Sequence, residues 1–166
     1  MINKPKTIAF LGVCTALAMV LAYVEILLPP VFPSIPGIKM GLPNIIIVFL
    51  LYRYGPAFAS AVSIVRIVLV SILFGNIMAF AYSIAGAALS LAVMIILRRL
   101  KFLSTVGVSV SGAVCHNIGQ ILAAMFLLKT SELGYYLVVL VVTGTIAGVL
   151  IGLCAATLEK RVPKNI

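Results

Sequence analysis

Long apolar stretches, separated by short groups of charged, proline and glycine residues, make up most of this chain. A helix that crosses the hydrocarbon core of a bilayer needs about 20 apolar residues, each rising about 1.5 Å. The pattern predicts about six transmembrane helices, over residues 7–28, 42–52, 56–74, 77–97, 106–128 and 135–158. We therefore expect an all-α membrane protein with a single integral membrane domain over residues 1–166.

The second predicted helix, residues 42–52, is too short to cross a bilayer alone. It would cover about 16 Å, against about 30 Å of hydrocarbon. The segment before it, residues 29–37, contains four prolines and cannot form a regular helix. Irregular backbone persists at membrane depth only where it is buried in protein or lines a cavity. We expect this proline-rich outer loop to dip inward and cover a site, and the alternative is an exposed loop above a tilted helix.

The composition supports a membrane protein, because 64% of the residues are hydrophobic and only 9% are charged. Soluble domains average roughly 45–50% apolar and about 25% charged residues. A soluble domain of 166 residues has too little interior to bury so much apolar surface. Lipid is therefore the expected solvent of most of this surface.

The net charge of +9 is distributed as membrane topology requires. With the N-terminus inside, the cytoplasmic segments hold Lys4, Lys6, Arg53, Arg98, Arg99, Lys101, Lys160, Arg161 and Lys164, and the outer segments hold Lys39 and Lys129. Cytoplasmic connections are enriched in Lys and Arg, so we expect both termini in the cytoplasm. No basic stripe is interleaved with aromatic residues, so the charge does not indicate nucleic-acid binding.

Two charged residues, Arg66 and Glu25, lie inside predicted membrane helices. An arginine at the bilayer centre costs about 2.5–3.5 kcal/mol on insertion scales, so Arg66 should face the bundle interior. Two interpretations remain open at this point. Arg66 forms a structural ion pair with Glu25, or it binds an anionic or strongly polar ligand.

The fifth predicted helix carries His116, Asn117 and Gln120 on one face. Polar groups at bilayer depth are costly unless they are paired or hydrated. A lone histidine is more often a packed, hydrogen-bonded residue than a ligand, but three adjacent polar groups favour a binding surface.

Three more polar residues, Lys39, Asn44 and Asn76, lie toward the outer side. Asn44 is in the first turn of the short helix, and helix N-termini attract anions. Together with Arg66, these residues predict a small-molecule ligand that bears a carboxylate, a phosphate or electron-rich carbonyls on a flat or apolar body.

The sequence contains no P-loop, zinc-protease or serine-hydrolase motif. It has no Asp, and its only acids are Glu25, Glu132 and Glu159. There is no GxxxxGK[ST], HExxH or GxSxG pattern and no carboxylate pair for acid–base chemistry. Cys14, Cys115 and Cys154 occur singly, without metal-ligand spacing. We expect a protein that is not an enzyme, with no metal and no cofactor, and any pumping energy would have to come from a partner or an ion gradient.

Small residues at four-residue spacing indicate close helix contacts. The last predicted helix has Gly144, Gly148 and Gly152, and the first pairs Gly12 with Ala16 and Ala18 with Ala22. Internal packing explains any one of these patterns, and together they leave room for a partner helix.

Two long motifs resemble signatures of the Gx transporter family. Residues 36–45 read PGIKMGLPNI, which resembles PGxKxGLxNI, and residues 109–120 read SVSGAVCHNIGQ, which resembles SVxGAxxHNxGQ. Glu25, Arg66 and the small-residue run 83–90 also lie where the family has an acid, a basic residue and small residues. The resemblance covers nearly the whole chain, although Pro43 replaces a common Ala.

This family is often labelled heptaprenyl diphosphate synthase component I, and it is similar to the substrate-binding S components of energy-coupling factor (ECF) transporters. The resemblance implies a six-helix protein of a prokaryotic cell membrane that binds a vitamin, flavin or other cofactor precursor from outside. It also implies a coupling membrane subunit and an ATPase pair as partners, engaged through an AxxxA pattern on the first helix. Ala18 and Ala22 match that pattern, and Gly12 and Ala16 lie nearer the cytoplasm.

Three other functions remain open at this stage. The chain could be a membrane subunit of a polyprenyl diphosphate synthase. It would be a non-catalytic subunit, because prenyl transfer needs aspartate-bound magnesium and this chain has no Asp. It could instead be a solitary ion-coupled carrier that uses Glu25 or His116, or a structural anchor for an electron-transfer complex.

Overall fold

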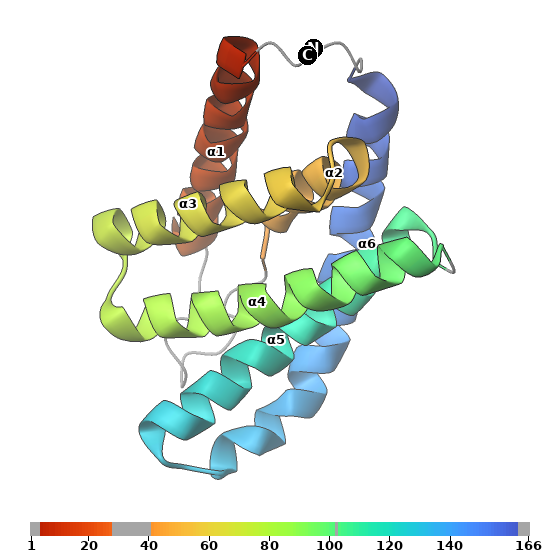
Figure 1. Ribbon diagram of the computed structural model, residues 1–166. Helices are drawn as coiled ribbons and strands as arrows, with labels where there is room; N and C mark the ends of the chain where they lie inside the picture. Colours follow the sequence, from red (N-terminus) through yellow and green to blue (C-terminus); the bar gives the residue numbers. More distant parts are fainter. Residues whose placement is uncertain (1–3, 28–40, 102, 163–166) are drawn as a thin grey trace.

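The computed structural model describes residues 4–27, 41–101 and 103–162. Its helices are α1 Lys4–Leu27, α2 Asn44–Arg53, α3 Pro56–Phe74, α4 Ile77–Leu100, α5 Thr105–Leu128 and α6 Leu137–Arg161, with a 3-10 turn at Glu132–Tyr136 (Figure 1). These residues contain no strand. The all-α prediction is therefore confirmed for the described part of the chain.

Five of the described helical stretches are long and apolar enough to cross a membrane. They are Pro5–Leu27, Pro56–Phe74, Ile77–Leu100, Thr105–Leu128 and Glu132–Arg161. α2 has only 10 residues, which corresponds to about 15 Å of helix. The chain is thus a multi-pass membrane protein whose described residues form five helices of spanning length, whereas the sequence predicted about six spanning helices.

Local signals set the helix ends. Pro56 occupies the first turn of α3, where its missing N–H costs nothing. The side chain of Asn76 accepts a hydrogen bond from the backbone N–H of Ala79 and caps α4. Ser104 caps α5 through the N–H of Gly107 in the same way. Lys129 ends α5 in a left-handed conformation. These signals explain why the sequence placed the ends of α3 and α5 within one residue.

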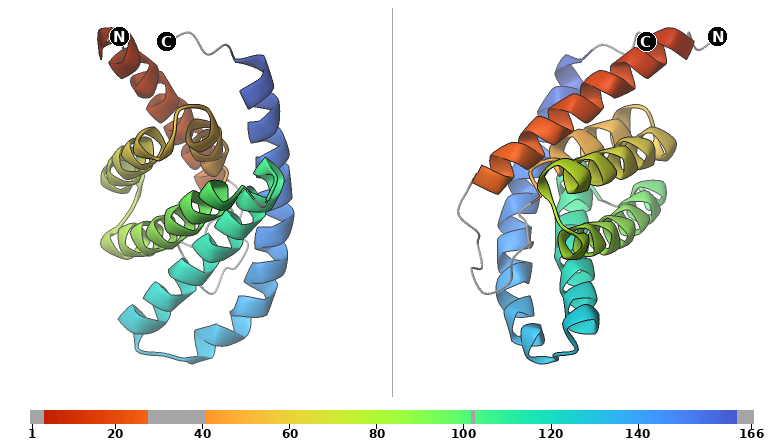
Figure 2. Two further views of the ribbon diagram at one scale, coloured as in Figure 1. Left: turned by 45° about the vertical axis from the view of Figure 1, so that its right-hand side comes forward. Right: turned by 90° about the vertical axis from the view of Figure 1, so that its left-hand side faces the viewer.

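α5 lies between α4 and α6, and it packs extensively against both (Figure 1). α3 packs against α1, α2 and α4, while α2 also packs against α6. The first turns of α1 and the last turns of α6 lie at one end of the molecule, and the turn between α5 and α6 lies at the opposite end (Figure 2). The buried polar side chains come from α1, α3, α4 and α5.

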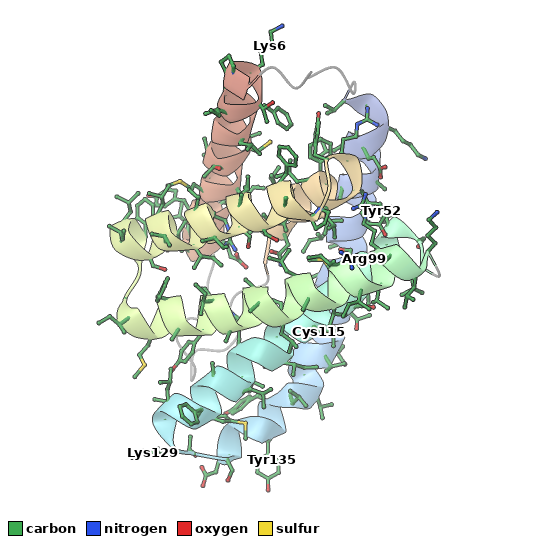
Figure 3. The ribbon with its side chains drawn as sticks, viewed as in Figure 1. Lys6, Tyr52, Arg99, Cys115, Lys129 and Tyr135 are labelled. Atoms are coloured by element: carbon green, nitrogen blue, oxygen red, sulfur yellow. The ribbon has the colours of Figure 1, made fainter. Side chains whose placement is uncertain are left out.

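Basic residues that the sequence assigned to opposite sides of the membrane lie at opposite ends of the molecule. Lys6 lies near the start of α1, and Lys129 lies at the turn that follows α5 (Figure 3). This separation agrees with the predicted orientation, in which Lys6 is cytoplasmic and Lys129 is external. The orientation itself stays a prediction.

Glycines bring the three helices α4, α5 and α6 into backbone contact. A Cβ atom on Gly148 would lie 2.6 Å from the Cα atom of Val110, and one on Gly119 would lie 2.7 Å from the carbonyl oxygen of Ala85. Only glycine permits such an approach in a membrane bundle. The glycine stripe on α6 therefore packs against α5 inside the chain.

α2 is a buried helix, because Ile47, Leu50 and Leu51 are almost completely inaccessible. In contrast, large apolar side chains such as Ile8 on α1, Ile64 on α3 and Ile146 on α6 are exposed. Apolar surface of this kind faces lipid in a membrane protein. Five long helices therefore supply the lipid-facing surface while the short one fills the interior.

The proline-rich loop lies outside the described residues, as does Lys39. The predicted inward dip of that loop therefore stays a prediction.

Candidate functional site

The buried polar side chains come from several helices. They are Glu25 on α1, Ser63 and Arg66 on α3, Ser90 on α4, and Ser109, His116, Asn117 and Gln120 on α5. Polar groups in a bilayer turn toward the protein interior, because lipid offers them no hydrogen bonds. The prediction that Arg66 faces the bundle interior is therefore confirmed, and the three polar side chains of α5 are buried as well.

Asn117 faces α6. Its Nδ2 atom donates a hydrogen bond of 2.8 Å to the carbonyl oxygen of Leu140. Gly144, one turn further along α6, makes room for this amide, because a Cβ atom there would lie 2.7 Å from Nδ2. The Nδ2 group of Asn117 therefore joins α5 to α6.

His116 and Gln120 face α4 at Gly86. A Cβ atom on Gly86 would lie 2.9 Å from Cγ of Gln120 and 3.0 Å from Cε1 of His116. The absence of a side chain at residue 86 therefore creates the space in which these two polar side chains lie. Asn117 thus faces α6 while His116 and Gln120 face α4, so the three side chains do not share one face as the sequence predicted.

Four buried atoms in this region have no hydrogen-bond partner among the described residues. They are Nε of Arg66, Nδ1 of His116, and both Oε1 and Nε2 of Gln120. Gln120 is 0% exposed, so bulk water does not reach its amide directly. Native proteins satisfy most buried polar atoms, and each unsatisfied group costs about 1–3 kcal/mol. These unpartnered atoms make the region a candidate binding site.

Charge interactions link Glu25, Arg66 and His116 across three helices. The carboxylate of Glu25 stabilises the guanidinium of Arg66, and Arg66 in turn lies close enough to act on His116. One oxygen of Glu25 is engaged elsewhere, because Oε1 accepts a hydrogen bond of 2.5 Å from the backbone N–H of Gly41. Arg66 therefore has an acidic neighbour and still presents an unpartnered Nε.

Asn44 lies beside Gly41 at the start of α2. Gly41 has a φ of +87°, and a Cβ atom there would lie 2.8 Å from Nδ2 of Asn44. Glycine is the residue that adopts this conformation without strain. Gly41 therefore brings together the first turn of α2, through Asn44, and the last turn of α1, through Glu25.

Asn76 is not joined to this group by any described contact. It is exposed, and its side-chain oxygen caps α4. It lines a different pocket of about 410 Å³ at the turn between α3 and α4, together with Ser71 and Phe80. The structure thus brings together Glu25, Arg66 and His116, with Gln120 beside His116 on α5, and it places Asn76 elsewhere.

The site offers hydrogen bonding and positive charge. Arg66 supplies a cation and an N–H donor, and the Gln120 amide supplies a donor and an acceptor. No group of three or more His, Cys, Asp or Glu side chains in the described residues could hold a metal ion. The arrangement therefore suits the recognition of a polar or anionic ligand.

Sequence reasoning missed three contributors to the site. The backbone N–H of Gly41 and the space at Gly86 both come from glycines, and Leu140 contributes only its carbonyl oxygen. Gly41 lies within the motif at 36–45 and Gly86 within the run at 83–90, so both glycines had a signal in the sequence. An apolar residue that acts through its carbonyl gives no such signal.

The small residues of α1 divide into two groups. Ala18 and Ala22 are 0% and 1% exposed, because they pack against other helices of this chain. Gly12 and Ala16 are exposed, and nothing lies within 4 Å of a Cβ atom built on Gly12. Ala18 and Ala22, which the sequence offered as partner contacts, are therefore corrected to internal packing residues, and Gly12 and Ala16 remain as candidates.

The chain matches one protein family over residues 14–158, and that family is described as heptaprenyl diphosphate synthase component I. The match includes α2 to α5 and most of α1 and α6. No curated protein and no solved structure matches the chain.

Proposed function

This chain belongs to the heptaprenyl diphosphate synthase component I family, also called the Gx transporter family, and on that basis we propose that it is a substrate-binding membrane subunit. It serves as the S component of an ECF-type uptake transporter for a vitamin, flavin or other cofactor precursor. It binds the substrate from outside and performs no catalysis itself.

The observation that carries this proposal is the group of unpartnered atoms on Arg66, His116 and Gln120. A purely structural cluster would satisfy its own members, because each unsatisfied buried group lowers stability by about 1–3 kcal/mol. A ligand that enters the site supplies the missing partners. Stability is given up at functional sites for this reason.

The chemistry of the site selects the class of ligand. Arg66 and the amide of Gln120 favour a carboxylate, a phosphate or a carbonyl-rich ring. Vitamins and flavins combine such groups with a flat or apolar body. Lys39 and Asn44 add to the site from the outer side in this proposal.

Partner subunits supply the energy. The sequence has no P-loop, so ATP hydrolysis takes place in an ATPase pair linked through a coupling membrane subunit. Gly12 and Ala16 form the exposed small-residue stripe on α1 that such a subunit contacts. Both termini lie in the cytoplasm of a prokaryotic cell, in agreement with the excess of Lys and Arg in the segments assigned to that side.

The proposal is tested by mass spectrometry of small molecules retained by the gently purified chain. We expect the wild-type chain to retain a vitamin, flavin or related precursor, and the variant Arg66→Met to lose it. Ser109→Ala is the control. Ser109 on α5 is buried, as Arg66 on α3 is, but its hydroxyl is already occupied because it donates to the carbonyl oxygen of Gly148. Retention of the same molecule by Arg66→Met would contradict the proposal.

The description of the family favours a second candidate, a membrane subunit of a polyprenyl diphosphate synthase. This chain would be a non-catalytic subunit, because it has no Asp to hold magnesium diphosphate. An assay for polyprenyl products with and without the chain separates the two candidates. Stimulation of a synthase by the chain, without any retained vitamin, would favour the second.

A further inference from the structure

The last turns of α2, α4 and α6 are joined by two arginines. Nη2 of Arg98 on α4 donates a hydrogen bond of 3.2 Å to the carbonyl oxygen of Tyr52, and its guanidinium carbon lies 5.6 Å from the centroid of the Tyr52 ring. Nη2 of Arg53 on α2 donates to the carbonyl oxygen of Val162, the residue that follows α6. Both arginines are therefore engaged inside the chain, and they bring the three helix ends together.

Four further cations at the ends of α4 and α6 are exposed and form what we call the basic patch. They are Arg99, Lys101, Lys160 and Arg161. None of their side chains has a hydrogen-bond or ion-pair partner within residues 4–27, 41–101 and 103–162. The segments 98–101 and 158–162 contain a single acid, Glu159. The basic patch therefore carries an excess of positive charge that the chain itself does not neutralise.

Exposed apolar side chains adjoin the basic patch on both helices. On α4, Ile96 and Leu100 are exposed, three residues before and one residue after Arg99. On α6, Leu153 is exposed about two turns before Lys160. Residues at these helical spacings lie on one face, as Ile96 does with Arg99. The exposed surface therefore changes from apolar to cationic toward the end of each helix.

We propose that the basic patch binds anionic phospholipid. The phosphate lies among the four cations, and the acyl chains lie along the exposed apolar side chains of α4 and α6. Arginine and lysine form strong, charge-assisted hydrogen bonds with phosphate oxygens. Basic residues beside a membrane helix attract anionic lipid in this way. This inference goes beyond the proposed function, because none of these residues belongs to the polar site.

An acidic segment of a partner protein is the competing occupant, since charge alone would attract it as well. A soluble acidic segment would match the cations but not the apolar side chains beside them. A free phosphate would leave those side chains without contact too. A phospholipid carries both chemistries in one molecule, and in the same order along the helix.

The experiment is native mass spectrometry of the full chain in detergent, with phosphatidylglycerol, phosphatidylcholine or glycerol phosphate added separately. We expect the wild-type chain to bind phosphatidylglycerol at least about fivefold more tightly than phosphatidylcholine, which has no net charge. The double variants Arg99→Gln with Lys101→Gln, and Lys160→Gln with Arg161→Gln, should each lose most of this preference. Glycerol phosphate, which has no acyl chains, should bind far more weakly.

The single variants Lys101→Gln and Lys129→Gln are a matched pair. Both lysines are exposed, and each follows a long helix in a left-handed conformation, with φ of 53° and 51°. Lys129 lies far from Arg99 (Figure 3). We expect Lys101→Gln to weaken phosphatidylglycerol binding about fivefold and Lys129→Gln to leave it unchanged. Equal losses in the two variants would show a general effect of charge and overturn the inference.

Three other results would also overturn it. The first is equal binding of phosphatidylglycerol and phosphatidylcholine by the wild-type chain. The second is equal binding of glycerol phosphate and phosphatidylglycerol, which would assign the basic patch to a soluble phosphate. The third is an unchanged lipid preference in both double variants, and their loss of copurification with a coupling subunit would then assign the patch to a partner protein. Retention of the small molecule tested with Arg66→Met is a separate measurement, so the proposed function stands or fails independently.

Discussion

The backbone N–H of Gly41 donates a hydrogen bond of 2.5 Å to Oε1 of Glu25, 16 residues earlier in the chain. This bond connects the last turn of α1 to the residues that lead into α2. Glu25 also stabilises the guanidinium of Arg66. We therefore expect Glu25 to act as a positioning residue for the site, through Gly41 and Arg66.

Replacement of Glu25 should separate its two roles. Glu25→Gln keeps an oxygen that can accept from Gly41 but removes the charge, whereas Glu25→Ala removes both. We expect Glu25→Ala to destabilise the protein by about 1–3 kcal/mol, because a buried N–H and a buried cation lose a partner. Thermal unfolding in detergent measures the difference. A loss for Glu25→Ala no larger than that for Glu25→Gln would show that the bond to Gly41 does not support the fold.

The contact between α4 and α5 should tolerate no added methyl group. In Gly119→Ala the new Cβ atom would lie 2.7 Å from the carbonyl oxygen of Ala85 and 2.9 Å from Cα of Gly86. We expect a loss of about 1–3 kcal/mol from overpacking. Gly12→Ala is the control, since its new methyl group meets nothing within 4 Å. Equal unfolding temperatures of the two variants would contradict the packing described.

The bond from Asn117 to Leu140 should contribute little to stability. Hydrogen bonds between membrane helices average about 0.6 kcal/mol, because the polar group also finds partners in the unfolded state. We expect Asn117→Ala to lower the unfolding temperature slightly and to leave the fold intact. Circular dichroism during thermal unfolding measures this. Complete unfolding of the variant at room temperature would show that the bond anchors the bundle.

The exposed part of α1 should be needed for partner binding and not for folding. Ala16→Trp places a bulky ring on the small-residue stripe beside Gly12. In cells that express an ECF module, we expect this variant to be produced normally and to lose copurification with the coupling subunit. Ile64→Trp on α3 is the control, because Ile64 is also exposed. Normal copurification of Ala16→Trp would remove this face from the proposed interface.

Much of the fold could be predicted from the sequence, because its main signals are local. The start of α3 at Pro56 and the start of α4 at Ile77 follow from a proline in the first turn and from the Asn76 cap. The burial of Arg66 followed from the cost of a charge in lipid. These properties depend on the residue itself and on its immediate neighbours.

The sequence could not show which small residues of α1 are exposed and which pack inside the chain. Gly12 with Ala16, and Ala18 with Ala22, have the same spacing, yet the first pair is exposed and the second is buried. Which face of α1 meets α3 depends on tertiary packing, and spacing alone does not report it. Asn76 is a similar case, because a polar residue near the outer end of a helix fits both a ligand contact and a cap.

The unpartnered amide of Gln120 is the most direct sign of a ligand at this site, and the variant Gln120→Met tests that role. Methionine has a similar length and no hydrogen-bonding amide, so it removes two unsatisfied buried atoms at small cost in packing. We predict that the ligand-free variant unfolds at the same temperature as the wild type or higher, and that it no longer retains the small molecule that copurifies with the wild type. A lower unfolding temperature together with undiminished retention would show that Gln120 is a structural residue and would contradict a binding site at this position.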